Sequence, residues 1–397
     1  MIGTGFKTTL LSVTHRYLPL LIVKIMIALA NTVANAFALI YLLRNGYSPA
    51  DCAIFMGIIG FASAGIIAMI SRTIVKHFHI AMQTALAVLC GYYISFIFLD
   101  DALLLIVPPL LFSVYLALFW IPYNSLVLHI TSPKKRGTAV GVYFLIFPFI
   151  GVLGPSIGGI VIHSIGYDFL FLTAICILIA DMLLIRIFKV TRELRERIII
   201  PELLRYVKVK LEGFPQLDLD LRGVGRPLSA SLISEGIEEG VILVYAPVMI
   251  FLLTDSELSS GGALSLFAFA GAIMTVILGY LTDRIGRRGT ILRASAIGAA
   301  IVVFHLALLN DLASFVTLMS IAYLSMAIIP SFLFIEVGER LESERKRGVA
   351  IREFMINLGT GVGAAMVFLI LLAGIDISLT ILLAAPAFAV LAFTKMK

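Results

Sequence analysis

Most of the ionisable side chains inside long apolar stretches, where such groups are costly, fall in the first and seventh stretches. Lys24 lies in the first stretch, and Glu235, Glu238 and Glu239 lie together in the seventh. An ionised side chain at the centre of a membrane span costs about 2.5–3.5 kcal/mol. Three glutamates facing lipid would therefore cost about 7–10 kcal/mol. We expect all four groups to face water, a partner or a proton, and the wall of a central cavity meets that need.

The three glutamates are candidates for proton coupling as well as for substrate binding. Carboxylates close together in a partly dry site hold a proton more tightly than they do in water. Glu239 lies closest to mid-depth, with Glu238 beside it, so we expect one of them to carry a proton near neutral pH. The alternative is a water-lined helix whose carboxylates stay ionised. Asp181, nearer the cytoplasmic end of the sixth stretch, is expected to be a packing or interface charge.

Polar and aromatic residues on further stretches complete the candidate substrate site. Lys24, Asn31 and Asn35 fall on one helical face at about 100° per residue. The other candidates are Trp120, Tyr123, Asn124, Tyr245 and Tyr323. Aromatic side chains beside a few polar groups suit an amphipathic or apolar solute. The alternative for each aromatic residue is plain packing.

The elements that position these residues are those of a membrane protein. Of 397 residues, 60% are hydrophobic and 14% are charged, whereas soluble domains are about half apolar and a quarter charged. A spanning helix needs about 20 mostly apolar residues. Twelve stretches meet this requirement: 17–43, 50–70, 80–98, 102–130, 139–163, 168–188, 228–253, 263–282, 292–310, 312–336, 349–373 and 376–394. The sequence therefore predicts an all-α polytopic membrane protein.

The basic residues predict how the chain lies in the membrane. Nearly all of the 30 Lys and Arg residues lie in alternate connections or at the termini, and the other connections are acidic, with Arg44 as their only base. This positive-inside pattern predicts a multi-pass protein of the cytoplasmic membrane with both termini in the cytoplasm. The net charge of +6 is then a topology signal, and we expect no nucleic-acid partner. The three cysteines lack metal-ligand spacing, so we expect neither a metal site nor a cofactor.

A long charged segment predicts two domains. Residues 189–227 are dense in Arg, Lys and Glu, and they separate six apolar stretches from six. The expected organisation is an N-terminal six-helix bundle over 1–188, a cytoplasmic linker over 189–227, and a C-terminal six-helix bundle over 228–397. The linker could also contain an interfacial helix, because part of it alternates charged and apolar residues.

A short repeat relates the two halves. Arg136, followed by glycine, opens the fifth helix, and Arg347, also followed by glycine, opens the eleventh, 211 residues later. The same offset carries Lys24 onto Glu235, so opposite charges occupy equivalent positions about 10–12 Å above the cytoplasmic helix start. We predict an ion pair between Lys24 and Glu235 that forms when the cytoplasmic side closes. The alternative is that Lys24 extends to the lipid headgroups.

Two motifs carry a family resemblance. The connection between the eighth and ninth stretches reads Gly279-Tyr-Leu-Thr-Asp283-Arg284-Ile-Gly286-Arg287-Arg288. It resembles the signature called motif A of the major facilitator superfamily. The fifth stretch contains Gly154-Pro155-Ser-Ile-Gly158-Gly159, which is similar to the end of that superfamily's motif C.

The resemblance implies a fold and a mechanism. The expected fold is twelve transmembrane helices in two pseudo-symmetric six-helix bundles, which expose a central site to each side alternately. Asp283 is expected to hold one half against the other at an inner gate, but Arg72 stands where the first half should carry its own aspartate. The expected gating residues are Asp283, Arg284, Arg287, Arg288, Gly154, Pro155, Arg136 and Arg347. Motif C is often seen in proton-coupled exporters.

These observations predict a secondary active transporter that moves a small organic solute, is coupled to protons and favours efflux. We expect a monomer in the lipid bilayer and no catalytic activity. An organic-anion carrier remains open, because Lys24 could recognise a carboxylate or a phosphate, and so does a lipid-type carrier. A polytopic membrane enzyme is less favoured because no nucleophile, base or metal cluster is seen. A channel fits the two-half repeat less well than a carrier, and no P-loop supports an ATP-driven pump.

Overall fold

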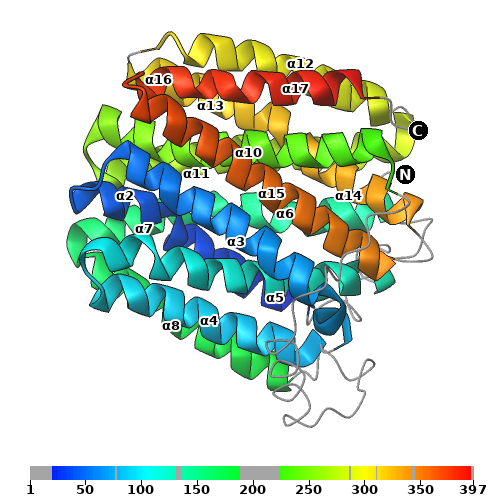
Figure 1. Ribbon diagram of the computed structural model, residues 1–397, viewed down its shortest axis with the longest axis horizontal. Helices are drawn as coiled ribbons and strands as arrows, with labels where there is room; N and C mark the ends of the chain where they lie inside the picture. Colours follow the sequence, from blue (N-terminus) through cyan, green and yellow to red (C-terminus); the bar gives the residue numbers. More distant parts are fainter. Residues whose placement is uncertain are drawn as a thin grey trace, which may run out of the picture.

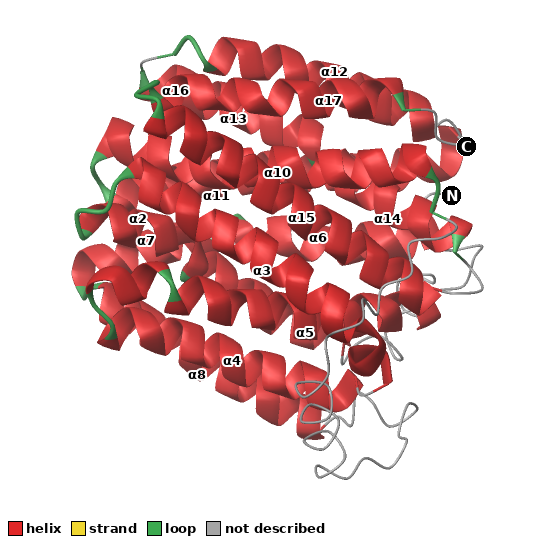
Figure 2. Ribbon diagram, in the orientation of Figure 1, coloured by secondary structure: helices red, strands yellow, loops and turns green. Residues whose placement is uncertain are grey.

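The chain folds as a bundle of long helices joined by short loops (Figure 2). The computed structural model describes residues 20–76, 78–130, 136–187, 224–285, 288–309, 311–341 and 345–394. Eleven helices within these residues are long and apolar enough to cross a membrane, and the shorter apolar segment Ile377–Phe393 follows them. Each of the twelve predicted apolar stretches corresponds to one of these segments, so the predicted all-α membrane fold is confirmed.

The first six spans lie before the charged segment. The first span runs from Leu20 to Arg44 and ends in the short helix α2. The following elements are α2 (Ala38–Arg44), α3 (Pro49–Lys76), α4 (Phe78–Phe98), α5 (Val107–Ile130), α6 (Arg136–Gly151), α7 (Gly154–Ser164) and α8 (Tyr167–Ile187). The fifth span consists of α6 and α7 together.

The last six spans begin at Arg226, two residues before the predicted start. They are formed by α10 (Arg226–Thr254), α11 (Glu257–Ile285), α12 (Arg288–Leu306), α13 (Leu312–Met326), α14 (Ile328–Arg340), α15 (Arg345–Leu372), α16 (Ile377–Thr380) and α17 (Ala385–Phe393). The tenth span consists of α13 and α14. Most of the predicted linker lies outside the described residues, and the division into two domains stays a prediction.

Three spans are interrupted within their length. The first span changes to a 3-10 turn at Asn35–Phe37, and the fifth breaks between Gly151 and Gly154. Pro155 follows directly at the start of α7, where its missing N–H cannot continue the hydrogen-bond ladder of the preceding helix. The tenth span breaks at Ala327, three residues before Pro330. Such interruptions are sites at which a helix can bend.

The two halves meet along seams of small residues. Figure 1 shows α3 beside α15 in the middle of the bundle, with α4 and α8 on one flank and α12 and α17 on the other. Gly60 of α3 lies so close to Gly361 of α15 that a Cβ atom at either position would collide with the opposite helix. Small residues allow such close approach of helix backbones, which is how membrane helices gain packing energy.

The outer surface is apolar, as a protein surrounded by lipid requires. Exposed large side chains include Phe98, Phe149, Leu172, Ile301 and Leu369, which come from five different spans. In a water-soluble protein a surface of this kind would mark a binding patch. Because it recurs around the bundle on helices that can span a bilayer, it is the surface expected to contact acyl chains.

Candidate functional site

Lys24 is enclosed by aromatic rings in the interior of the bundle. Its side chain is 3% exposed, and its ammonium donates a hydrogen bond of 2.7 Å to the backbone carbonyl of Tyr143. The ammonium nitrogen lies 2.9 Å from the centre of the Tyr143 ring and between 5.5 and 5.8 Å from those of Trp120, Phe144 and Phe147. Ring faces attract a cation, and more strongly once water is removed. Lys24 therefore does not extend to the headgroups.

Arg352 forms the second buried cation and binds two carboxylates. One guanidinium nitrogen donates to Glu235 on α10 at 2.9 Å, and another donates to the neighbouring Glu353 at 2.9 Å. All three side chains are buried. The planar guanidinium presents several donors in a fixed fork, so one arginine can hold two carboxylates at once. The seventh and eleventh spans are thereby joined by charge at the centre of the bundle.

Two neutral residues connect these charges across the two halves. The side-chain amide of Asn124 donates to Glu353 at 3.0 Å, and the hydroxyl of Tyr143 donates to the amide oxygen of the same asparagine. Tyr143 also stacks on Phe334 of α14 at 5.9 Å. The resulting series is called the central polar chain here and consists of Lys24, Tyr143, Asn124, Glu353, Arg352 and Glu235.

The predicted direct pair of Lys24 with Glu235 is absent from this structure, and its formation on closure of the cytoplasmic side stays a prediction. Glu235 is bound by Arg352, and Lys24 is turned toward Tyr143. The physical reason is that the guanidinium fork reaches two carboxylates from the next helix, while the flexible lysine chain finds a carbonyl and ring faces nearby. The two residues are linked only indirectly, through the central polar chain.

Glu238 and Glu239 have no cation bound to them among the described residues. Glu238 is 3% exposed, and one of its carboxylate oxygens is buried without a hydrogen-bond partner. Glu239, the next residue, is exposed and has no described hydrogen bond or ion pair. Together with Glu235, these residues place three carboxylates within two turns of α10, of which Arg352 binds only one.

The remaining predicted binding residues fall into separate groups. Trp120 and Tyr123 border Lys24 and Tyr143, with ring centres 6.2 Å apart. Asn31 and Asn35 instead contact tyrosines of α4 and α5 within the N-terminal half: Tyr92, Tyr93 and Tyr115. Tyr245 donates to the backbone of α12, and Tyr323 stacks on Phe267. The structure does not bring these last four predicted residues into the central polar chain.

The predicted gating residues are described only in part. Gly154 and Pro155 open α7, where Gly154 packs on Thr32 and the Pro155 carbonyl approaches Gly261 of α11. Arg347 is half-buried in the first turn of α15. The side chains of Asp283, Arg284, Arg287, Arg288 and Arg136 lie outside the described residues. The cytoplasmic gate therefore stays a prediction.

Three members of the central site were not among the predicted binding residues. Arg352 and Glu353 stand near the start of the eleventh span, where a charged pair usually belongs to the gate or the connection. Tyr143 lies in an apolar stretch that gives no polar signal. Arg352 could have been found from its position. It stands seven residues after Arg345, where α15 begins, so its charge falls within the bundle.

Comparison with known proteins agrees with this architecture. The family model of the Major Facilitator Superfamily matches residues 228–396. The uncharacterized protein YqgE of Bacillus subtilis (strain 168) is 24% identical over 386 residues, which cover 90% of this chain and 83% of that protein.

A solved structure shares the fold over nearly the full length. The crystal structure of the human organic anion transporter MFSD10 (TETRAN) superposes with a TM-score of 0.66 at 13% sequence identity, covering 95% of this chain and 97% of that chain. At this identity the likeness concerns the fold. The C-terminal half thus matches the Major Facilitator Superfamily model, and the whole chain is similar in fold to a solved structure of a membrane transporter.

Proposed function

We propose that this protein is a proton-coupled secondary transporter that moves a small organic solute across the cytoplasmic membrane by alternating access, as a monomer and in the efflux direction. The observation that carries the proposal is the imbalance of charge around the central polar chain. Glu235, Glu238, Glu239 and Glu353 lie there with only two described cations, Lys24 and Arg352.

An imbalance of this kind favours the binding of protons. An ionised carboxylate taken out of water without a cation loses several kcal/mol of hydration. A proton removes that cost, and it can leave again only when the carboxylate meets water. Glu238 is buried and lacks a partner for one oxygen, while Glu239 beside it is exposed. We assign proton uptake and release to these two residues.

The links of the central polar chain supply the coupling to movement. The hydrogen bond from Asn124 to Glu353 and the stacking of Tyr143 on Phe334 both join the first half to the second. Rocking of the halves separates these partners and exposes the charges to one side. Protonation changes the charge of the same centre, so proton binding and the position of the halves bias each other. The motif C resemblance at Gly154–Gly159 supports the efflux direction.

The test is solute flux in proteoliposomes with an imposed pH gradient, measured over a panel of organic solutes. Glu239→Gln and Glu238→Gln remove a titrating group while keeping nearly the same shape. We expect each variant to lose gradient-driven flux by at least about tenfold, as removal of a positioned proton carrier commonly does, while exchange without a gradient is less affected.

Glu336→Gln is the matched control, because Glu336 is a buried glutamate that binds Arg340 within the same helix. It is expected to retain gradient-driven flux. Equal responses of Glu336→Gln, Glu238→Gln and Glu239→Gln would contradict the assignment of the proton site. Flux that ignores the pH gradient in the unmodified protein would contradict proton coupling itself.

An organic-anion carrier is the second candidate, and one observation favours it. The ammonium of Lys24 has a single described hydrogen-bond acceptor, the Tyr143 carbonyl, and otherwise faces aromatic rings. A solute carboxylate or phosphate would be a stronger acceptor. The human protein MFSD10, whose solved structure shares this fold, is an organic anion transporter. Competition by simple aromatic carboxylates in the flux assay, lost in Lys24→Gln, distinguishes this candidate from transport of neutral or cationic solutes.

A further inference from the structure

We propose that Arg44, Asp255 and Glu257 form a latch that holds the two halves together at the acidic end of the molecule and must open before the central site can face that side. The proposal rests on alternating access as proposed above. The acidic end carries the connections that contain Arg44, Asp255 and Asp311, and it is the predicted external end.

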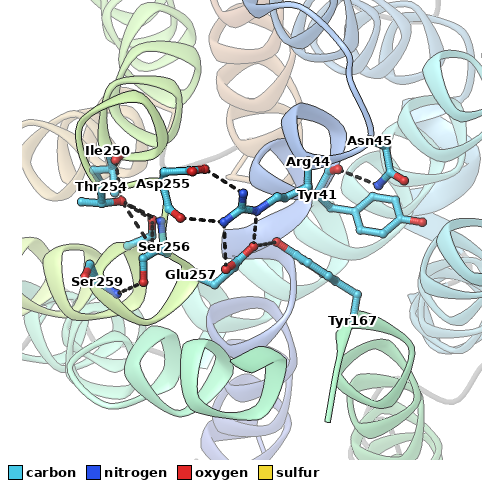
Figure 3. A network of polar contacts seen from close by, with 11 residues as sticks. Tyr41, Arg44, Asn45, Tyr167, Ile250, Thr254, Asp255, Ser256, Glu257 and Ser259 are labelled. Atoms are coloured by element: carbon cyan, nitrogen blue, oxygen red, sulfur yellow. Dashed lines mark hydrogen bonds and ion pairs between the residues drawn. The ribbon is translucent and has the colours of Figure 1, made fainter. Parts of the chain in front are cut away.

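Arg44 uses its whole guanidinium in this contact (Figure 3). Its Nε donates to Glu257 Oε1 at 2.6 Å and its Nη1 donates to Asp255 Oδ1 at 2.7 Å. Its Nη2 donates to the backbone carbonyl of Asp255 at 2.7 Å and to Glu257 Oε2 at 3.3 Å. Charge-assisted bonds in a fork geometry are among the stronger hydrogen bonds in proteins.

The surrounding residues hold the partners in place. Tyr167, at the start of α8, donates its hydroxyl to Glu257 at 3.3 Å, and the Phe251 ring lies 5.1 Å from the Arg44 guanidinium carbon. Asp255 adopts a left-handed backbone with φ of 45°, which is uncommon for residues other than glycine. This conformation ends α10 and leaves both the carboxylate and the carbonyl of Asp255 available to Arg44.

The contact joins the halves at equivalent positions. Arg44 is the last residue of the first span and Asp255 directly follows the seventh, and the two are 211 residues apart, the same offset that relates Arg136 to Arg347. Arg44 and Tyr167 belong to the first half, and Asp255 and Glu257 belong to the second. Arg44 is also the only base in the connections of the acidic end, so no neighbouring Lys or Arg of those connections can replace it.

The latch lies above a closed seam between α7 and α11. A Cβ atom on Gly159 would collide with the backbone at Glu257, and one on Gly261 would collide with that of Pro155. Ser265, eight residues after Glu257 on α11, is buried. It accepts hydrogen bonds from the backbone N–H and hydroxyl of Ser156 at 3.1 and 2.8 Å. Opening toward the acidic end must separate this seam, and that movement pulls Arg44 away from its carboxylates.

The experiment measures access to the seam without any transported solute. Ser265→Cys places a thiol between the halves in a chain whose three cysteines (Cys52, Cys90 and Cys176) are replaced by serine. A membrane-impermeant maleimide is applied to intact cells and to inside-out vesicles. Arg44→Gln is expected to raise the labelling rate about three- to tenfold from the acidic end, as loss of a partly exposed charge network predicts.

Two further variants make the result specific. Arg340→Gln breaks an Arg–Glu pair of the same 2.6 Å length that lies within α14, so it cannot join the halves and is expected to leave labelling unchanged. The charge swap Arg44→Asp with Asp255→Arg is expected to return labelling toward the starting rate. High salt should accelerate labelling when Arg44 is present and have less effect in Arg44→Gln, because salt screens the latch.

Equal labelling rates for Arg44→Gln and Arg340→Gln would overturn the proposal, and so would acceleration only from the end that carries the basic connections. The melting temperature of each purified variant separates opening from unfolding. If Arg44→Gln does not fold, the charge swap provides the test. A charge-swap variant that folds but is still labelled fast then overturns the proposal. Because labelling needs no solute, a negative result here is distinguishable from a negative flux experiment.

Discussion

At the residue scale, the two buried cations, Lys24 and Arg352, differ in how their charge is compensated. Arg352 is balanced by Glu235 and Glu353, so its removal leaves carboxylates buried without a partner. Among the described residues, Lys24 contacts a backbone carbonyl and aromatic rings, with no carboxylate bound to it. A buried charge without an ionic partner destabilises a fold unless it serves another purpose. Lys24 is thus the better candidate for a residue retained for function.

Lys24→Met tests this difference, because methionine has a similar length and no charge. We expect the melting temperature in detergent to stay the same or rise, since a poorly compensated buried cation is replaced by an apolar side chain. Solute flux is expected to fall at least about tenfold, equivalent to about 1.4 kcal/mol. Arg352→Met is the contrasting variant, and we expect it to lose about 3–5 kcal/mol of folding free energy.

A lower melting temperature for Lys24→Met than for Arg352→Met would contradict this reading of the two cations.

The sequence identified the charged residues of this site but not their partners. Lys24 and Glu235 were predicted because ionisable groups are costly in apolar stretches, an effect that depends only on position along the chain. Their contacts depend on side-chain reach and on the rotation of each helix, which an offset of 211 residues does not determine. Asp181 was expected to be a packing or interface charge. It is fully buried, and neither of its carboxylate oxygens has a hydrogen-bond partner among the described residues.

At the scale of the elements, the glycine seams determine how closely the halves approach. Gly60 and Gly361 bring α3 of the first half into backbone contact with α15 of the second. Within the second half, Gly236 and Gly359 do the same for α10 and α15. The helix ends followed from apolar runs of about 20 residues. The break at Pro155 was also predictable from its missing N–H. The 3-10 turn at Asn35–Phe37 was not, because that segment contains neither proline nor glycine.

Gly60→Ala is expected to destabilise the protein because the added Cβ atom meets the backbone of Gly361. Overpacking of this kind typically costs about 1–3 kcal/mol, which a lower melting temperature in detergent would reveal. Gly65→Ala is the matched control on the same helix, since a Cβ atom there has nothing within 4 Å. An equal melting temperature for the two alanine variants would show that the seam tolerates a side chain.

At the scale of the whole molecule, the acidic connections and the basic connections lie at opposite ends of the spans. The predicted external end is formed by turns such as the one at Gly46, with φ of 84°, and the one at Gly374, with φ of 77°. Positive φ suits glycine, which makes these sharp turns possible. The offset of 211 residues that relates the two halves also relates Arg44 to Asp255. The sequence contains this relation, but only the structure shows that the two residues are in contact.

Protease sites inserted after Gly46 and after Gly374 test the predicted orientation. Nothing lies within 4 Å of a Cβ atom at either position, so an insertion there is expected to be tolerated. We expect a protease added to intact cells to cut both sites, and a site inserted in 189–227 to be cut only in inside-out vesicles. The opposite pattern would reverse the orientation while leaving the fold unchanged.

Tyr143 makes several contacts at the centre of the bundle depend on one another. Its carbonyl receives the Lys24 ammonium, its ring lies beneath that ammonium, and its hydroxyl donates to Asn124. A rotation of α6 about its own axis would move Tyr143 and break all three contacts together. Substitutions along this series are therefore expected to be non-additive, with the first broken link removing most of the effect.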